Sequence, residues 1–106
     1  MIQAQDIQHG KATYYADKFQ GNKTASGEIY VKDSLTAAYR SIPFGTLVKV
    51  TNVKNDRSVI VRINDRGPYI KNRIIDLSRK AMKILGGIED GVIDVVLEII
   101  EVKPDK

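Results

Sequence analysis

Apolar and polar residues alternate most regularly in the middle of the chain. LVKVTNV (47–53) and SVIVRIN (58–64) place an apolar side chain at almost every second position, as half-buried strands do. KNDR (54–57), which separates them, has the composition of a tight turn. The pattern therefore predicts a β-hairpin over residues 46–64.

Shorter runs predict the other elements. Strands are expected at KATYY (11–15), EIYV (28–31), RIID (73–76) and VIDVVLEIIEV (92–102), which are rich in β-branched and aromatic residues. SLTAAY (34–39) predicts one helical turn capped by Ser34. A clearer helix is expected after Ser78, with Ala81, Met82 and Leu85 on one face and Gly86–Gly87 at its end. About six strands with one clear helix favour a small barrel, because closure leaves no strand edge exposed.

The chain also contains a faint internal repeat. Gly45-TLVKV and Gly91-VIDVV both place a glycine immediately before an apolar strand. A duplicated ββ unit that forms a pseudo-symmetric barrel would produce this pattern, and so would chance.

Length and charge limit the function classes. The 106 residues suffice for one domain with one core. No apolar run approaches the roughly 20 residues needed to cross a bilayer, and MIQAQDIQHG at the N-terminus is not a secretion signal, so we expect no membrane contact by this chain. The net charge is +4, but the cations are spread along the chain, which does not indicate nucleic-acid binding. An anionic polymer such as bacterial cell wall is an equally good electrostatic partner.

The residue types leave few kinds of catalytic chemistry. His9 is the only histidine, it lies near the N-terminus, and the chain has no cysteine. We therefore expect no metal site and no Ser-His-Asp arrangement. No phosphate-binding or dinucleotide motif is present, and no cofactor is expected.

Carboxylates remain as candidate catalytic groups. Asp65 and Asp76 each follow an apolar β-type run, with a tight turn between them, and Glu28 follows a Gly-containing loop. Cleavage of a glycosidic bond requires two acids: one protonates the leaving oxygen, and the other stabilises the transition state or accepts a proton. Aromatic faces on which sugar rings can pack would come from Tyr14, Tyr15 and Tyr69.

Each acid also has a purely structural interpretation. Asp65 lies in an Asn-Asp-Arg-Gly turn, where aspartate commonly bonds to nearby backbone. Asp76 precedes a predicted helix and can stabilise its N-terminus electrostatically. Glu28 can be a plain surface charge. The patterns alone leave these alternatives open.

Three segments resemble the rare lipoprotein A (RlpA-like) family of double-psi β-barrel domains. They are GKATYYADKFQGNKTASGE (10–28), LTAAYRSIPFGTLVKVTN (35–52) and VRINDRGPYIKNRIIDLSRKAMKILG (61–86), in order and at the expected spacings. The resemblance implies a mainly β fold, a six-stranded barrel of two interlocked halves with one or two short helices. It places this domain at residues 10–102, between short tails at 1–9 and 103–106.

The resemblance also implies an activity. Some members of the family are lytic transglycosylases, which cut peptidoglycan glycan strands that lack stem peptides and leave 1,6-anhydromuramic ends. The implied partner is therefore peptidoglycan. The implied location is the bacterial cell envelope, periplasmic or extracellular, with any signal or lipid anchor outside these 106 residues.

Site residues are carried over from the family motifs position by position. Asp65 of INDRGP is expected to be the main acid/base, with Glu28 of TASGE as a second acid and Asp76 of IIDLS as a third. In the related expansin-like barrels, the positions of Asp76 and Thr13 line the site. Residues expected to contact sugar are Thr13, Tyr14, Tyr15, Tyr39, Asn64, Arg66 and Tyr69.

The chain departs from the family motif at two positions. The family usually reads LTAAH, whereas this chain has Tyr39 in place of the histidine, and Ala16 stands where the family usually has glycine. A histidine shuttles protons near neutral pH, but a tyrosine, with an ordinary pKa near 10, does so far less readily. Two functions are therefore carried forward: a lytic transglycosylase, and a non-catalytic, expansin-like module that binds cell-wall glycan.

Overall fold

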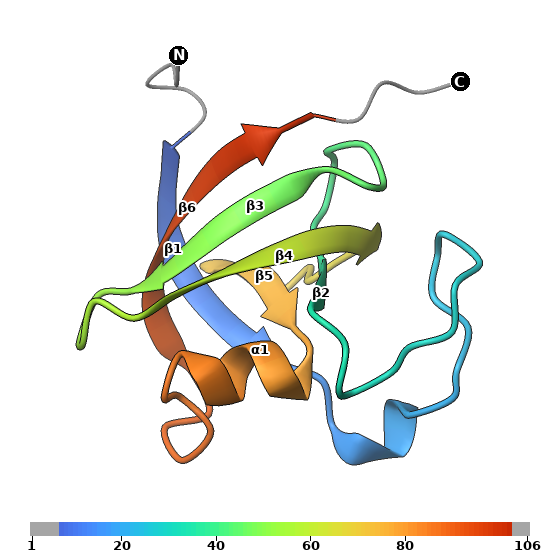
Figure 1. Cartoon of the computed structure of the whole chain (residues 1–106), viewed down its shortest axis with the longest axis horizontal. Coiled ribbons are helices and arrows are strands. Elements are labelled where there is room, and N and C mark those ends of the chain that lie inside the picture. The colour runs from blue at the N-terminus through green and yellow to red at the C-terminus, as the bar shows by residue number, and fades with distance from the viewer. Residues whose placement is uncertain (1–6, 103–106) are drawn as a thin grey trace.

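The computed structural model describes residues 7–102, which form a closed barrel of six strands (Figure 1). The strands are β1 (Ile7–Tyr14), β2 (Thr36–Ala38), β3 (Leu47–Asn52), β4 (Ser58–Asp65), β5 (Arg73–Leu77) and β6 (Ile93–Glu101). A 3-10 helix, η2 (Asp17–Phe19), and an α-helix, α1 (Arg79–Ile84), complete the set. The predicted mainly β barrel with one or two short helices is confirmed.

The strand pairings give the barrel a twofold pseudo-symmetry. The order around the barrel is β1-β5-β2-β4-β3-β6, and the parallel pairs are β1–β5 and β2–β4. Exchanging β1 with β4, β2 with β5 and β3 with β6 turns every strand pairing into another pairing of the barrel. Gly45 and Gly91 precede the equivalent strands β3 and β6, and both have positive φ values, 91° and 75°. The faint repeat in the sequence thus has a structural counterpart.

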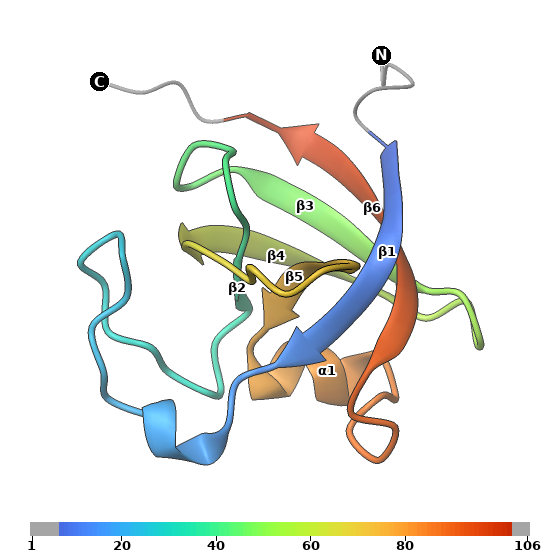
Figure 2. The same ribbon diagram turned by 180° about the vertical axis from the view of Figure 1, so that it is seen from behind.

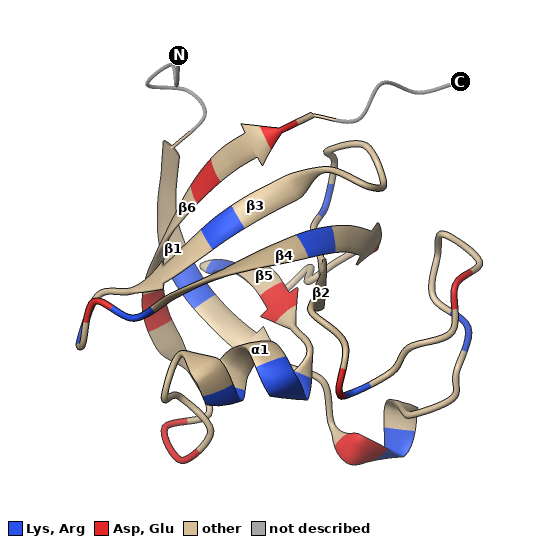
Figure 3. Ribbon diagram, viewed as in Figure 1, with Lys and Arg blue, Asp and Glu red and all other residues tan. Residues whose placement is uncertain are grey.

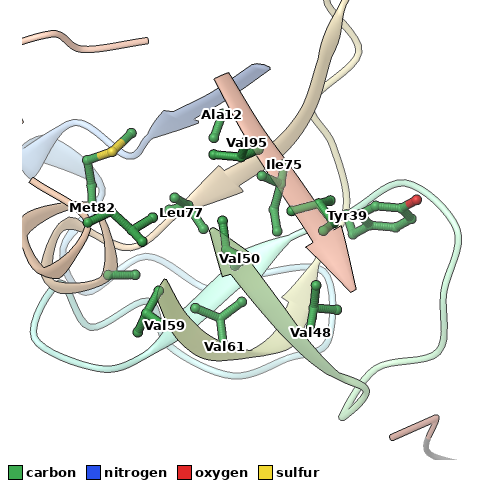
Figure 4. Packing of buried hydrophobic residues seen from close by; sticks show 14 of the residues in the cluster. Ala12, Tyr39, Val48, Val50, Val59, Val61, Ile75, Leu77, Met82 and Val95 are labelled. Atoms are coloured by element: carbon green, nitrogen blue, oxygen red, sulfur yellow. The ribbon is translucent and has the colours of Figure 1, made fainter. Parts of the chain in front are cut away.

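The core fills the barrel interior. β3 and β4 pair in antiparallel fashion as the predicted hairpin, and their buried inward positions alternate with partly or fully exposed ones. Branched side chains from several strands meet there (Figure 4): Val48, Val50, Val59, Val61, Ile63, Ile75, Leu77 and Val95. This pattern of period two is what the sequence displays.

α1 lies at one end of the barrel (Figure 1) and adds its apolar face to the core. Ser78 caps the helix as predicted, because its hydroxyl oxygen accepts a hydrogen bond from the N–H of Ala81. Ala81, Met82 and Leu85 are fully buried, and Gly86 ends the helix at a positive φ of 71°. Within residues 7–102, no helix is long and apolar enough to span a bilayer.

Two predicted strands differ from the structure. β1 begins at Ile7, before the predicted strand at 11–15, because Ile7 and His9 pair with Glu98 and Val96 of β6. The predicted tails are otherwise outside the described residues. The segment 28–31 is not a regular strand: Ile29 forms a single bridge with Lys23 inside the loop that follows η2.

The helical turn predicted at SLTAAY was wrong. Thr36–Ala38 is the strand β2, paired with β4 on one side and β5 on the other, and all three residues are buried. Ser34 caps nothing; its carbonyl oxygen accepts a hydrogen bond from the Ser78 hydroxyl at 2.5 Å. Tertiary pairing overrides the weak local preference of alanine for helix.

Candidate active site

Asp65 is the last residue of β4 and follows an irregularity in the strand. Ala37 pairs with Ile63 and Ala38 pairs with Asp65, so Asn64 is an extra residue in the β2–β4 ladder. Ile63 and Asn64 are therefore both buried, and the regular alternation of β4 ends there. A bulge of this kind redirects the side chains that follow it.

Three hydrogen-bond donors orient the Asp65 carboxyl group. Its Oδ1 accepts bonds from the backbone N–H of Ala25 at 2.8 Å and of Arg66 at 2.9 Å. Its Oδ2 accepts a bond from the hydroxyl of Tyr15. The Arg66 bond fits the structural interpretation of a turn aspartate, but the other two donors come from a loop some 40 to 50 residues earlier in the chain.

Asp76 of β5 lies beside Asp65 across a single strand. Ala38 of β2 is the pairing partner of both acids, so their Cα atoms are two strand spacings apart, roughly 9.5 Å. Asp76 is half-buried, and its Oδ1 accepts a bond from the Thr13 hydroxyl at 3.1 Å. Burial raises the pKa of Asp76, the Thr13 bond lowers it, and the negative charge of Asp65 raises it further.

The structure shows no hydrogen bond between the Asp76 side chain and the helix N-terminus, where Ser78 is the cap. The helix-stabilising interpretation of Asp76 thus has no hydrogen bond to support it. Its hydrogen-bond partner is the hydroxyl of Thr13 on β1, and its environment is set by burial and by a second acid.

Glu28 lies in the loop next to the end of β4. Its carboxylate pairs with the Arg62 guanidinium at 2.7 Å, and its side chain is about half exposed (44%). The hydrogen bond from Arg62 lowers the pKa of Glu28, and a bond from Asn64 lowers it further. The N–H of Ser26 donates to the Asn64 carbonyl at 3.2 Å, so the loop is bonded directly to β4. Glu28 is therefore held ionised by Arg62 and Asn64, close to the end of β4 that carries Asp65.

The structure brings several of the predicted contact residues next to the three acids. Thr13 and Tyr15 donate to the two aspartates, and Asn64 bonds to Glu28. The Arg66 guanidinium lies 3.9 Å from the ring centroid of Phe44. One end of the barrel thus gathers three acids with their polar partners.

Two other predicted contact residues, Tyr14 and Tyr39, have their side chains elsewhere. Tyr14 points to the opposite side of β1, where its hydroxyl donates to the carbonyl of Ile88 at 3.2 Å. Tyr39 donates its hydroxyl to the side chain of Gln8 at 2.7 Å and lines a separate cavity of about 160 Å³. Only the backbone of Tyr39 reaches Asp65, through an N–H bond to its carbonyl oxygen at 3.1 Å. Tyr69 is 76% exposed and follows the cis Gly67–Pro68 bond.

Sequence reasoning missed three contributors to the site. Ala25 acts through its backbone N–H, which no pattern of side chains reveals. Tyr30 stacks on Tyr15 with ring centroids 4.3 Å apart, and Phe44 packs on Arg66. The burial of Tyr30, which is 2% exposed, was predictable only as part of a strand that does not form.

The sequence that forms this site matches the model of a known protein family. Residues 7–97 match the model of a double-psi β-barrel family described as lytic transglycolase. The chain belongs to this family. The resemblance noted in the sequence is thereby confirmed over nearly all of the described residues.

Relatives named as peptidoglycan transglycosylases support the family membership. An endolytic peptidoglycan transglycosylase RlpA of Pasteurella multocida is 53% identical over 92 residues, 87% of this chain and 31% of that protein. The protein of the same name from Campylobacter jejuni is 48% identical over 91 residues, 86% of this chain and 33% of that protein. The chain therefore spans about a third of the length of these relatives.

Solved structures share the fold of the lytic transglycolase domain. A papain inhibitor from Streptomyces superposes with a TM-score of 0.72 at 26% identity, over 90% of this chain and 94% of the inhibitor. An expansin from Clavibacter michiganensis gives 0.70 at 26% identity, over 94% of this chain and 52% of the expansin. A variant of that expansin in complex with cellohexaose gives 0.69 at 21% identity, over 94% and 53%, which concerns the fold alone.

Proposed function

We propose that this chain is the catalytic domain of a peptidoglycan lytic transglycosylase that cleaves glycan strands to 1,6-anhydromuramic ends. The observation that carries the proposal is the pair of aspartates on either side of Ala38, which have different surroundings. The named relatives, at about 50% identity, support peptidoglycan as the substrate. A substrate of this kind places the domain in the bacterial cell envelope.

The reaction needs one proton donor and one proton acceptor, and no water. The C6 hydroxyl of the muramic residue attacks its own C1, so the C1–O6 bond forms while the bond from C1 to the leaving oxygen breaks. The leaving oxygen gains a proton, and the attacking hydroxyl loses one. Atoms balance within the glycan, because the protein lends and recovers a single proton overall.

The surroundings of the acids support a division of these roles. Asp76 has a raised pKa and so keeps its proton to higher pH, as the donor to the leaving oxygen requires. Asp65, oriented by three donors, is the group that receives the C6 hydroxyl proton. Glu28, held ionised by Arg62, supplies negative charge toward the oxocarbenium-like transition state. Asn64, Arg66, Thr13 and the exposed Tyr69 are proposed to surround the sugar.

The second candidate function is a non-catalytic module that binds cell-wall glycan. The expansin likeness and the replacement of the family histidine by Tyr39 favour it. The two functions predict different products, because a binding module retains glycan without cutting it.

A digest of purified, peptide-free glycan strands tests the proposal. The folded domain is expected to release fragments whose muramic ends are one water lighter than hydrolysed ends, as read by mass spectrometry. Intact, peptide-bearing peptidoglycan serves as the comparison substrate and is expected to give fewer such ends. Retention of glycan in a pull-down without any released fragment would instead support the binding module.

Replacing Tyr39 with histidine is expected to preserve or raise the rate of cleavage. The family carries histidine here, and the Tyr39 hydroxyl contacts Gln8, not a carboxylate of the site. Loss of that one hydrogen bond is expected to lower the free energy of unfolding by about 1 kcal/mol. The measurement is the initial rate of anhydro-end release by the wild type and the variant.

Tyr39→Phe is the matched control, since it removes the same hydroxyl without adding an imidazole. A large loss of cleavage in folded Tyr39→His, with Tyr39→Phe unaffected, would contradict the family analogy at this position.

A further inference from the structure

The hydroxyl of Tyr15 faces a carboxylate rather than solvent. It donates to Oδ2 of Asp65, while the backbone N–H of Ala25 donates to Oδ1. Both donors belong to the segment that leaves β1, which Figure 2 shows passing from the barrel into the projecting loop. Each oxygen of the Asp65 carboxylate therefore receives a hydrogen bond from the segment 15–25, which lies outside the barrel.

The ring of Tyr15 is held by other aromatic rings. Tyr30 stacks on it with centroids 4.3 Å apart and an interplanar angle of 15°. Phe19 meets it edge-on at 6.0 Å and 85°. One face of the Tyr15 ring is thus covered by protein and cannot pack against a sugar ring. The backbone N–H of Tyr15 bonds to the Leu77 carbonyl at 3.0 Å and fixes the ring relative to β5.

Tyr30, beneath it, is anchored in turn. It is 2% exposed, and its hydroxyl accepts a hydrogen bond from the N–H of Arg79 at 3.2 Å. Its backbone bonds to both Gly21 and Asn22. A continuous series of contacts therefore runs from the first turn of α1 through two stacked rings to the Asp65 carboxylate.

Tyr15 is suited to donating a hydrogen bond and unsuited to moving a proton. Burial raises its pKa far above the ordinary value near 10, and the bond to Asp65 and the charges of Asp65, Asp76 and Tyr30 raise it further. The phenol stays protonated at any pH at which glycan is cleaved.

We propose that Tyr15 is a positioning residue that fixes the Asp65 carboxylate for proton transfer, supported by its stack on Tyr30. The proposal rests on the proposed function and gives Tyr15 a role other than the expected sugar platform. A displacement of a reacting group by about 1 Å lowers rates by on the order of 100-fold. Holding Oδ2 in place therefore affects the chemical step more than substrate binding.

Tyr15→Phe keeps the ring and its stack but removes the hydroxyl. We expect kcat for anhydro-end release to fall about 10- to 100-fold, with KM changed less than about twofold. Tyr14→Phe is the matched control, because the neighbouring hydroxyl bonds to the Ile88 carbonyl away from the acids. Equal kcat in folded Tyr15→Phe and wild type, or a loss confined to KM, would overturn the proposal.

A spectroscopic readout separates this proposal from the proposed function. In protein carrying ¹³C in its aspartate carboxyl groups, Tyr15→Phe is expected to move the Asp65 carboxyl signal, because the carboxylate loses a hydrogen-bond donor. The two proteins differ only at Tyr15, so both retain the charged residues Asp76, Glu28 and Arg66. This shift is expected even if wild type cuts no glycan, an outcome that would reject the transglycosylase but not the hydrogen bond.

An unchanged Asp65 carboxyl signal in Tyr15→Phe would overturn the positioning role. Should Tyr15→Phe fail to fold, wild type and Asp65→Asn with ¹³C at the tyrosine Cζ give a second test. The Tyr15 signal is expected to move in Asp65→Asn while the Tyr14 signal does not. A Tyr15 signal that stays in place would reject the bond.

Discussion

Asp65→Asn is expected to abolish glycan cleavage while leaving the barrel folded. An amide cannot accept the C6 hydroxyl proton, and loss of a general base lowers rates by about 100- to 10,000-fold. The amide is isosteric with the carboxyl, and its oxygen can still accept the bonds from Ala25 and Arg66. The measurement is anhydro-end release by mass spectrometry, together with thermal unfolding of both proteins.

Asp94→Asn is the control for this substitution. Asp94 is an exposed acid on β6, paired with Lys11 at 2.8 Å and 69% accessible at its side chain. The substitution Asp94→Asn makes the same change of charge away from the site, so the cleavage rate of this variant should equal that of wild type. Cleavage by folded Asp65→Asn at the wild-type rate would remove Asp65 from the mechanism.

The elements with a strong local signal were predictable from the sequence. The β3–β4 hairpin has alternation and a turn, and the Ser78 cap, the apolar face of α1 and Gly86 define that helix. Asp65 and Asp76 stood out because each ends an apolar run, where chain geometry leaves polar groups at the rim of a sheet.

Other features depend on contacts between distant segments and leave no local pattern. β2 is only three residues long, and it becomes a strand because β4 and β5 pair with both of its edges. The placement of Asp65 beside Asp76 follows from that pairing through Ala38. The bonds from Ala25 and Tyr15 to Asp65 need the loop to fold back onto β4, which side-chain composition does not encode.

The fold by itself does not determine the chemistry. A papain inhibitor and an expansin share this barrel, as the superpositions show, so the function must be argued from the residues at the end of β4 and β5. Lysine and arginine are distributed over strands, loop and α1 without forming a stripe (Figure 3).

Asp76→Asn is expected to lower cleavage by about 100-fold or more, because the leaving oxygen loses its proton donor. In wild type, activity should fall as pH rises through the raised pKa of Asp76, since the acid is then deprotonated. The variant should lack this alkaline limb in whatever residual rate remains. A rate profile over pH, measured for both proteins, checks the assignment.

The same variant is expected to be more stable than wild type at neutral pH. A carboxyl whose pKa is raised by folding favours the native state below its ordinary pKa, about 4, and loses that contribution as pH rises through the folded value. At neutral pH, Asp76 is therefore a half-buried acid that disfavours folding, and asparagine can still accept the Thr13 bond. The gain in unfolding temperature should be small near pH 4 and larger near pH 7. If Asp76 is a proton donor kept in a destabilising environment, Asp76→Asn raises the stability and lowers the cleavage rate. A variant that loses both stability and activity would instead mean that Asp76 is structural.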